Sequence, residues 1–348
     1  MLKTKLKDWL LKITAPFRRL TIPKIAFSAD SAIDKLMAFL NSWWHTLIIA
    51  LAAIVFLYYP LGGLLVSNID RNIGYEINET HPEQSATVEM MAFIVNREVN
   101  EKIWTPNLPF FYPSYFLDNM PNFQLGMFDA LSKFASSFAK RTDKKINSAD
   151  KPSHLTAAAE LLRYPGTVWM FSAENKLLLA PSANIQYRKA RRQLTDYNAQ
   201  LSAGRETFYR SPEDLAYLLN KTRINLRKSS TLLEDHIREE SSSWWDNKAD
   251  NVFYYQQGKA YAYYLLFKAL GYDYKEIIVR ADQYRNWTSL LKALEDASSL
   301  QPTIVRNGEL NSLTAPNHLG YLNMYINKAR SLMVQIIKSL QQPQPHRN

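Results

Sequence analysis

The sequence predicts a mainly α-helical protein, with one N-terminal transmembrane helix, a large helical extracytoplasmic domain and one or two small β-hairpins. Residues 43–66 contain no ionised side chain, and nothing else in the chain is as long and as apolar. After residue 85, apolar residues recur three and four positions apart over most of the chain, as in amphipathic helices. Glycine is scarce, at 10 of 348 residues, which favours long helices over a glycine-rich nucleotide-binding chain.

Residues 43–66 are interpreted as an uncleaved membrane anchor. A helix over this range is roughly 36 Å long, which exceeds a hydrocarbon core of about 30 Å. A buried helix in a globular domain would show a polar stripe, and a signal peptide would begin close to residue 1. Pro60 is expected to kink the last turns, so that the span ends near Leu61.

The charges on either side of this anchor predict its orientation. Eight basic and three acidic residues precede Trp43, whereas Arg71 is the one basic residue shortly after the span. By the positive-inside rule the N-terminus lies in the cytoplasm, and residues 67–348 lie on the other side. We therefore expect a single-pass protein of the bacterial inner membrane with a periplasmic C-terminal domain.

Residues 1–42 form a cytoplasmic basic segment whose first turns read as an amphipathic helix on the anionic inner leaflet. The alternative is a solvated basic tail that only enforces topology. A nucleic-acid partner is not expected, because the rest of the chain is mildly basic and has no concentrated patch. The residues expected to contact anionic phospholipid are Lys3, Lys5, Lys7, Trp9, Lys12, Arg18 and Arg19.

The remainder divides into a juxtamembrane linker at 67–84, a helical periplasmic domain at 85–341 and a disordered tail at 342–348. Ser85 and Ser211-Pro212 are helix-start signals, and Gly204 is a stop. The helices before and after Gly204 are expected to pair as an antiparallel hairpin. The helix containing residues 253–270 is apolar nearly all round and is placed in the core. Hairpins are expected near residues 167–180 and around Asn307-Gly308.

Residues 105–123 combine four prolines with many aromatic residues, which predicts an extended, ordered connection. We favour the interpretation that these rings cover a helical core. The alternative is an aromatic surface on the membrane or on a partner, and we expect at least one ring to face the bilayer. The candidate surface residues are Phe110, Phe111, Tyr112, Tyr115 and Phe116.

The sequence contains few candidate catalytic or metal-binding residues. Zero cysteines exclude disulfides and thiolate catalysis. His236 and Glu240 are neighbours on a helix, but two ligands do not make a metal site, so neither a metal nor a cofactor is expected. Glu160 could act as the general acid of a hydrolase, although a lone helical Glu is usually exposed or paired.

A last candidate is a polar cluster that would form if the 304–308 turn packs on the start of the final helix. Capping of that helix by Asn317 is the favoured explanation, ahead of a binding site. The cluster comprises Arg306, Asn307, Asn317 and His318.

Three segments of the chain resemble a known family: "YYQQGKAYAYYLLFKAL" at 254–270, "LEDASSLQPTIVRNG" at 294–308 and "APNHLGYLNMYINKA" at 315–329. They are similar to proteobacterial inner-membrane proteins catalogued as domain of unknown function 2333. The resemblance implies an envelope setting and a mainly helical fold. It implies no activity and no catalytic residues.

Two functions from different classes remain open. The preferred one is a non-enzymatic, inner-membrane-anchored periplasmic scaffold or assembly factor with an envelope protein as partner. The alternative is a membrane-tethered hydrolase acting on cell-wall glycan or lipid. A scaffold would tolerate change of a single carboxylate or histidine and fail when its exposed aromatic residues are altered.

Overall fold

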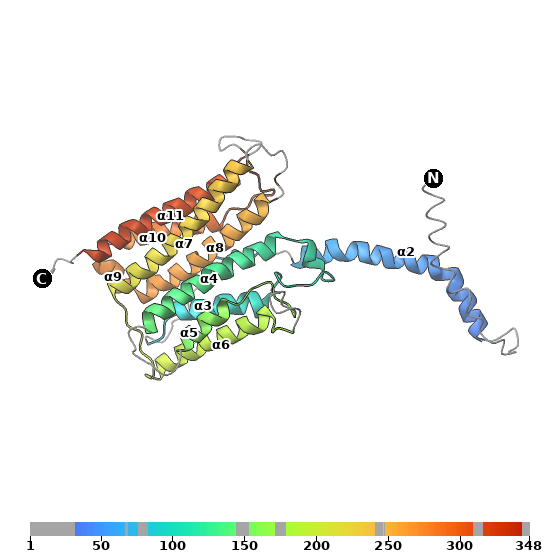
Figure 1. Ribbon diagram of the computed structural model, residues 1–348, viewed down its shortest axis with the longest axis horizontal. Coiled ribbons are helices and arrows are strands. Elements are labelled where there is room, and N and C mark those ends of the chain that lie inside the picture. Colours follow the sequence, from blue (N-terminus) through green and yellow to red (C-terminus); the bar gives the residue numbers. More distant parts are fainter. Residues whose placement is uncertain are drawn as a thin grey trace. The chain divides into compact units, whose positions relative to one another are not determined.

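The computed structural model describes residues 32–66, 69–75, 83–143, 153–170, 179–240, 246, 248–308 and 316–342. Within these ranges the chain is helical and contains no β-strand, so the predicted mainly α class is confirmed (Figure 1). The membrane-contact residues expected between Lys3 and Arg19 lie outside the described residues. Residues 343–348 of the expected tail also lie outside them.

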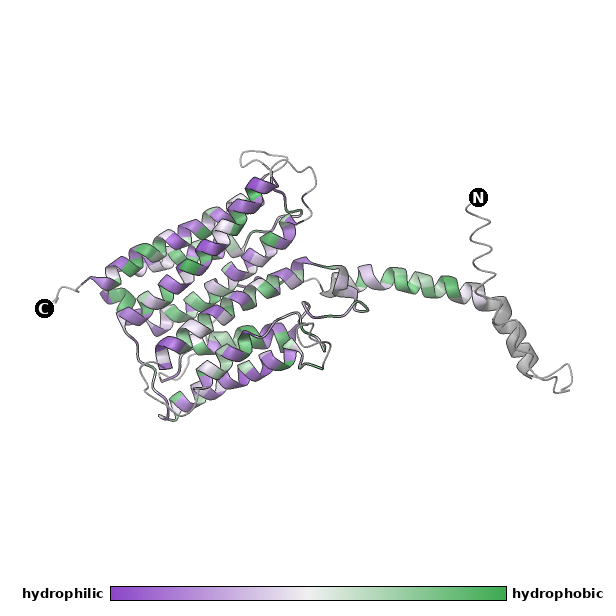
Figure 2. Ribbon diagram, in the orientation of Figure 1, coloured by the Kyte–Doolittle hydropathy of each residue, from purple (hydrophilic) through white to green (hydrophobic). Residues whose placement is uncertain are grey.

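The chain consists of two compact units, residues 1–57 and 58–348. Helix α2 (Ala32–Val66) begins in the first unit and ends in the second, and it continues through Pro60 to Val66. The end of the membrane span near Leu61 stays a prediction. Apolar residues predominate where its side chains are described, and most of these are exposed (Figure 2). Across the described part of the chain, no helix combines the length and the apolar character that a membrane crossing requires.

The second unit holds two groups of helices that meet where α4 packs on α8 (Figure 1). The first group is α3 (Ala86–Asn96), α4 (Asn119–Asp143), α5 (His154–Leu162) and α6 (Ala183–Ser202). The second group is α7 (Pro212–Glu239), α8 (Ala249–Asp273), α9 (Lys275–Arg280), α10 (Tyr284–Ser298) and α11 (His318–Gln341). A π-helical turn, η2 (Arg97–Glu101), and a 3₁₀ turn, η3 (Pro113–Phe116), follow α3.

Two glycines bring α4 and α8 into backbone contact. A Cβ atom on Gly126 would lie 1.9 Å from the Tyr255 carbonyl oxygen, and one on Gly258 would lie 2.0 Å from the Phe123 carbonyl oxygen. Each helix therefore places a residue without a side chain against the backbone of the other. We call this contact the α4–α8 seam. The predicted central position of α8 is confirmed, since residues on all sides of it are buried.

The expected hairpin of α6 and α7 is wrong. Helix α6 packs on α5 and α3, whereas α7 packs mainly on α11. The signals at the ends of these helices are nevertheless confirmed, with Gly204 at a φ of 65° after α6 and the Ser211 side chain accepting a hydrogen bond from the Asp214 amide. Local signals set where each helix starts and stops, but the partner depends on which apolar faces meet in the whole domain.

The predicted β-hairpins are not strands in the described residues. Between 167 and 180 the Ala180 amide donates to the Met170 carbonyl, while residues 171–178 lie outside the described residues. Asn307 forms a single antiparallel bridge with Asn317 in place of a tight turn with Gly308. In each case the described residues show two ends brought together, with no ladder of paired residues among them.

The described part of the expected linker, residues 69–75, is docked on the domain. Its backbone carbonyls are acceptors: the Tyr261 hydroxyl donates to Asn72 over 2.6 Å, and Lys268 Nζ donates to Tyr75 over 2.9 Å. The Tyr75 ring stacks on Phe93 with centroids 3.6 Å apart. A polar, aperiodic sequence led to the prediction of a linker, but the donors Tyr261 and Lys268 on α8 hold this stretch in place.

A buried ion pair lies beside that segment. Arg97 Nε is 2.8 Å from Glu98 Oε1, both side chains are almost fully buried, and Arg97 also donates to the Tyr261 hydroxyl over 2.6 Å. Gln124 on α4 donates to the second Glu98 oxygen. Burial, partly opposed by Arg97, raises the pKa of Tyr261 to about 12, so its hydroxyl stays protonated and able to donate to residue 72.

Candidate functional site

The first candidate site is a set of exposed aromatic rings, which we call the aromatic surface. The exposed fractions are 68% for Phe110, 47% for Phe111, 40% for Tyr112 and 53% for Tyr115. Trp169 joins this set, its ring centroid 5.9 Å from that of Phe111. The Phe111 ring contacts Phe110, Tyr112 and Trp169 edge-on or tilted, so these four rings form one cluster. Tyr115 lies on the same loop and is also exposed.

The end of α2 holds the loop that carries these rings. The Tyr58 hydroxyl donates to the Phe111 carbonyl and the Tyr59 hydroxyl donates to the Phe110 carbonyl, each over 3.1 Å. The absence of a side chain at Gly62 leaves room for Pro113, whose Cβ lies 2.4 Å from where a Cβ of Gly62 would be. The loop is therefore ordered by backbone acceptors and a proline contact, and the rings do not need to be buried to hold it.

The favoured interpretation, that these rings cover the core, is wrong for the four described residues. The Phe116 side chain lies outside the described residues. Burial within 104–123 is confined to the two ends, where Trp104 and Phe123 are buried. The Trp104 indole donates to the Gly166 carbonyl, which anchors that end of the loop. The expectation of at least one exposed ring is confirmed, whereas its orientation toward a bilayer stays a prediction.

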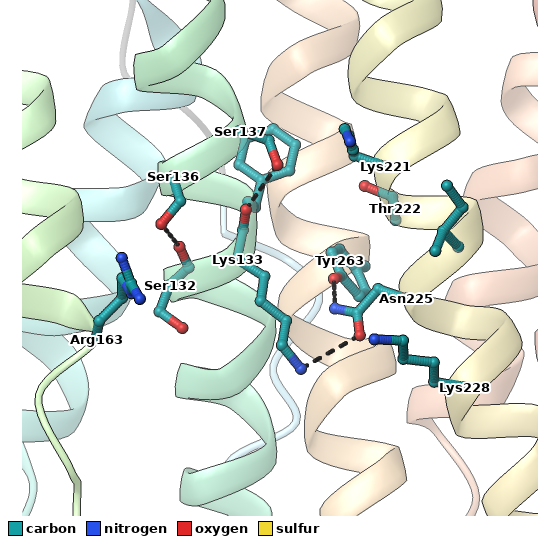
Figure 3. A pocket seen from close by; sticks show the side chains of 12 residues that line it. Ser132, Lys133, Ser136, Ser137, Arg163, Lys221, Thr222, Asn225, Lys228 and Tyr263 are labelled. Atoms are coloured by element: carbon teal, nitrogen blue, oxygen red, sulfur yellow. Dashed lines mark hydrogen bonds between the residues drawn. The ribbon is translucent and has the colours of Figure 1, made fainter.

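The second candidate site is a hollow between α4 and α7, with a volume of about 510 Å³, which we call the basic groove. Figure 3 shows side chains of α4, the end of α5, α7 and α8 around it. The size falls within the range of small-molecule pockets, roughly 300–1,000 Å³. The basic side chains that line it are Lys133, Arg163, Lys221 and Lys228.

The floor of the groove is a polar network in which Asn225, Tyr263 and Lys259 are buried and Lys133 is exposed. Lys133 Nζ and Lys259 Nζ each lie 3.4 Å from the Asn225 side-chain oxygen, and the Asn225 amide group donates to the Tyr263 hydroxyl (Figure 3). Lys259 is 3% exposed and pairs with Asp129 at 3.1 Å. Two ammonium groups thus converge on one neutral oxygen below the opening.

The positive charge of the groove exceeds its negative charge. None of the lining residues is acidic, and the nearby Asp129 carboxylate is shared by Lys133 at 2.7 Å and Lys259 at 3.1 Å. Burial lowers the pKa of Lys259, and the charges of Lys133 and Lys228 lower it further, whereas Asp129 raises it. Among the described residues, Arg163 and Lys228 make no ion pair with a carboxylate.

Sequence reasoning missed this groove. Lys221, Asn225 and Lys228 are spaced four and three apart, so they lie on one face of α7, and this was the available signal. A lysine at such spacing is ordinarily part of a solvated helix face. What distinguishes these residues is their position opposite Lys133 of α4, which requires the tertiary structure.

The predicted polar cluster does come together. The Arg306 amide donates to His318 Nδ1 over 3.0 Å, and the Asn317 side-chain nitrogen donates to the Asn307 side-chain oxygen over 3.0 Å. The Asn317 side-chain oxygen accepts from the Gly320 amide at the start of α11. The favoured explanation, helix capping by Asn317, is therefore confirmed.

The remaining candidates are placed apart from each other. His236 Nε2 lies 2.8 Å from Asp246 Oδ2, and the described residues contain no group of three or more His, Cys, Asp or Glu side chains that could hold a metal ion. Glu160 is exposed on α5. A carboxyl group that acts as a general acid is typically enclosed in an apolar pocket, whereas the Glu160 side chain is exposed.

The architecture defines the body as a multi-helix domain built around a central helix, without a recognisable catalytic constellation in the described residues. The comparisons with known proteins place it in a family. A model of DUF2333, described as an uncharacterized protein conserved in bacteria, matches residues 107–237 and 215–343. Because these matches together extend over more than half of the chain, the protein belongs to this family. No curated protein and no solved structure matches it.

Proposed function

We propose that this protein is a non-enzymatic scaffold or assembly factor of the bacterial cell envelope, anchored in the inner membrane through residues 43–66. The observation that carries the proposal is the aromatic surface: four rings of one loop are exposed together and are tied to the end of α2. Contiguous exposed apolar surface on a domain is characteristic of protein or membrane contacts.

The sequence supports the anchor and its orientation. Residues 43–66 carry no ionised side chain, and they lie within one continuous helix. The excess of basic residues before Trp43 favours a cytoplasmic N-terminus and a periplasmic domain. On this topology the aromatic surface, which is held by Tyr58 and Tyr59, sits close to the outer end of the span, where rings with an apolar body and a polar edge are favoured.

The hydrolase alternative relied on Glu160 as a buried general acid. Because Glu160 is exposed on α5, it does not support that alternative. The proposal therefore keeps the scaffold, with a bilayer and an envelope protein as its partners. Interface energy concentrates in a few aromatic anchors, so the aromatic surface is the place where substitution is expected to remove function.

A two-part experiment tests the proposal. A reporter that is active only outside the cytoplasm, fused after Asn348, is expected to be active in a stable fusion. The triple substitution Phe110→Ala, Phe111→Ala and Tyr115→Ala is expected to leave expression and melting temperature unchanged and to abolish recovery of a crosslinked envelope partner. Ile304→Ala, also at an exposed apolar residue, is the control. An inactive reporter contradicts the topology, and unchanged crosslinking contradicts the scaffold surface.

A further inference from the structure

The basic groove gathers more positive charge than its nearby carboxylate can neutralise. Lys133 shares Asp129 with Lys259, whereas Lys221, Lys228 and Arg163 are exposed and make no ion pair with a carboxylate in the described part of the chain. Here three lysines and one arginine line a single hollow with no acidic residue among them. Repulsion among like charges makes this arrangement costly unless an anion offsets it.

We propose that the basic groove binds a small ligand carrying two or more phosphate groups. Three of the four basic residues are lysines, which bind phosphate as point charges, whereas planar carboxylates are recognised best by paired arginine nitrogens. The Thr222 hydroxyl, which also lines the hollow, is a further donor. The volume of the hollow, about 510 Å³, suits a ligand of a few charged groups.

The spacing of the lysines sets the number of charged groups. Lys221 and Lys228 are two helical turns apart, which separates their Cα atoms by about 10 Å along α7. Lys133 approaches from α4, opposite Asn225, which lies between those two positions. Three ammonium groups spread along this row are neutralised better by a ligand with two or more phosphates than by a single phosphate.

Lys259 contributes from below the groove. Its ammonium group is buried and pairs with Asp129, so it does not reach the ligand, but its charge adds to the positive potential at the floor. Asn225 accepts from Lys133 and Lys259 at 3.4 Å, longer than the usual 2.9–3.0 Å, so a phosphate oxygen could replace Asn225 as a partner of Lys133, which also pairs with Asp129 at 2.7 Å. We thus assign Lys259 and Asn225 a positioning role and Lys133, Lys221 and Lys228 the direct contacts.

Calorimetric titration of the full-length chain in neutral detergent with inorganic tripolyphosphate tests this proposal. The wild type is expected to bind one equivalent. Lys221→Gln combined with Lys228→Gln is expected to weaken binding at least tenfold without a change in melting temperature, because both side chains are exposed. Lys328→Gln combined with Lys338→Gln removes the same charge from exposed positions of α11 and is expected to leave binding within twofold of the wild type.

Competition identifies the source of the phosphate groups. Displacement of tripolyphosphate by tetrahexanoyl cardiolipin, a lipid with two phosphates, would indicate a lipid headgroup, and failure to displace it would indicate a soluble phosphate compound. No measurable binding, or equal weakening by both double variants, would overturn the proposal. Citrate binding as tight as tripolyphosphate would overturn the assignment to phosphate. None of these results depends on the aromatic surface.

Discussion

The α4–α8 seam and the aromatic surface are both rich in aromatic rings, yet their rings meet opposite environments. Phe123, Phe253 and Tyr261 at the seam are fully buried, whereas Phe110 and Phe111 are about half exposed or more. In the seam, glycines let two backbones touch, and the rings fill the space around that contact. On the loop, prolines and tyrosine hydroxyls hold the backbone, so the rings are free to face outward.

This difference separates residues that stabilise the domain from residues that are available for contact. A buried ring gains the free energy of leaving water, roughly 1.5–3 kcal/mol for a Phe-sized side chain. An exposed ring gains little of it in the isolated chain. These exposed rings are the surface that the proposed membrane or partner contact would cover.

The largest effect is expected at the seam glycines. Gly258→Leu would drive a side chain into the Phe123 carbonyl, and no flexible side chain can yield there. We expect a loss of more than about 4 kcal/mol in the free energy of unfolding, or no folded protein. Chemical denaturation measures it. Gly204→Ala, in open space at positive φ, is the control and should cost about 1–2 kcal/mol. Similar losses for both would mean that the seam is not closely packed.

The next effect distinguishes the two kinds of ring. Phe123→Ala is expected to cost about 3–5 kcal/mol, because it leaves a cavity beside Tyr261 in a closely packed region. Phe111→Ala removes the same side chain from the aromatic surface and is expected to change stability by less than about 0.5 kcal/mol. Urea unfolding of both variants measures the contrast. Equal losses would show that the exposed ring stabilises the fold after all.

A smaller, pH-dependent effect is expected at the floor of the basic groove. Burial acts to raise the pKa of Asp129, but Lys259 and Lys133 together hold it below its ordinary value. A carboxyl group with a lowered pKa in the folded state stabilises the fold above its unfolded pKa of about 3.9, and this contribution is lost as the pH falls through the folded pKa.

Asp129→Asn is therefore expected to cost about 1.5–3 kcal/mol at pH 7, the range for hydrogen bonds to charged groups. The difference from the wild type should shrink as the pH falls below about 4, since protonation of Asp129 then removes the same charge. Denaturant titrations of both proteins across pH 3–7 give the comparison. A difference that stays constant over this range would mean that the carboxylate charge contributes nothing.

Several elements could be predicted from the sequence because their signals are local. The Ser211-Pro212 start of α7 and the capping of α11 by Asn317 depend on residues within one turn, and the apolar surround of α8 indicated its central place. The docking of residues 69–75 could not be predicted, because it relies on donors almost 200 positions away, on Tyr261 and Lys268.

The same reason explains the errors at the candidate sites. In the sequence, Gly126 and Gly258 are simply residues of low helix propensity. Their role becomes clear only in the structure, where the backbones of α4 and α8 touch at these two positions. The exposure of Phe110 depends on hydrogen bonds from Tyr59, which the sequence separates by about fifty residues. The lysines of the basic groove line one hollow only because α4 and α7 face each other in the folded domain.

Substitution at Phe111 is expected to have the smallest effect on stability and to report membrane contact most clearly. Because the chain contains no cysteine, a single introduced cysteine can be labelled there to measure this contact. A single spin label at Phe111→Cys, in the full chain reconstituted into vesicles, reports whether the ring position meets lipid. Ile304→Cys, an exposed apolar position of the body, is the control. The account predicts that the label at 111 is accessible to oxygen and shielded from a water-soluble nickel complex, while the label at 304 is open to the nickel complex. Equal access of the nickel complex to both labels would contradict the proposal that the aromatic surface lies on the membrane.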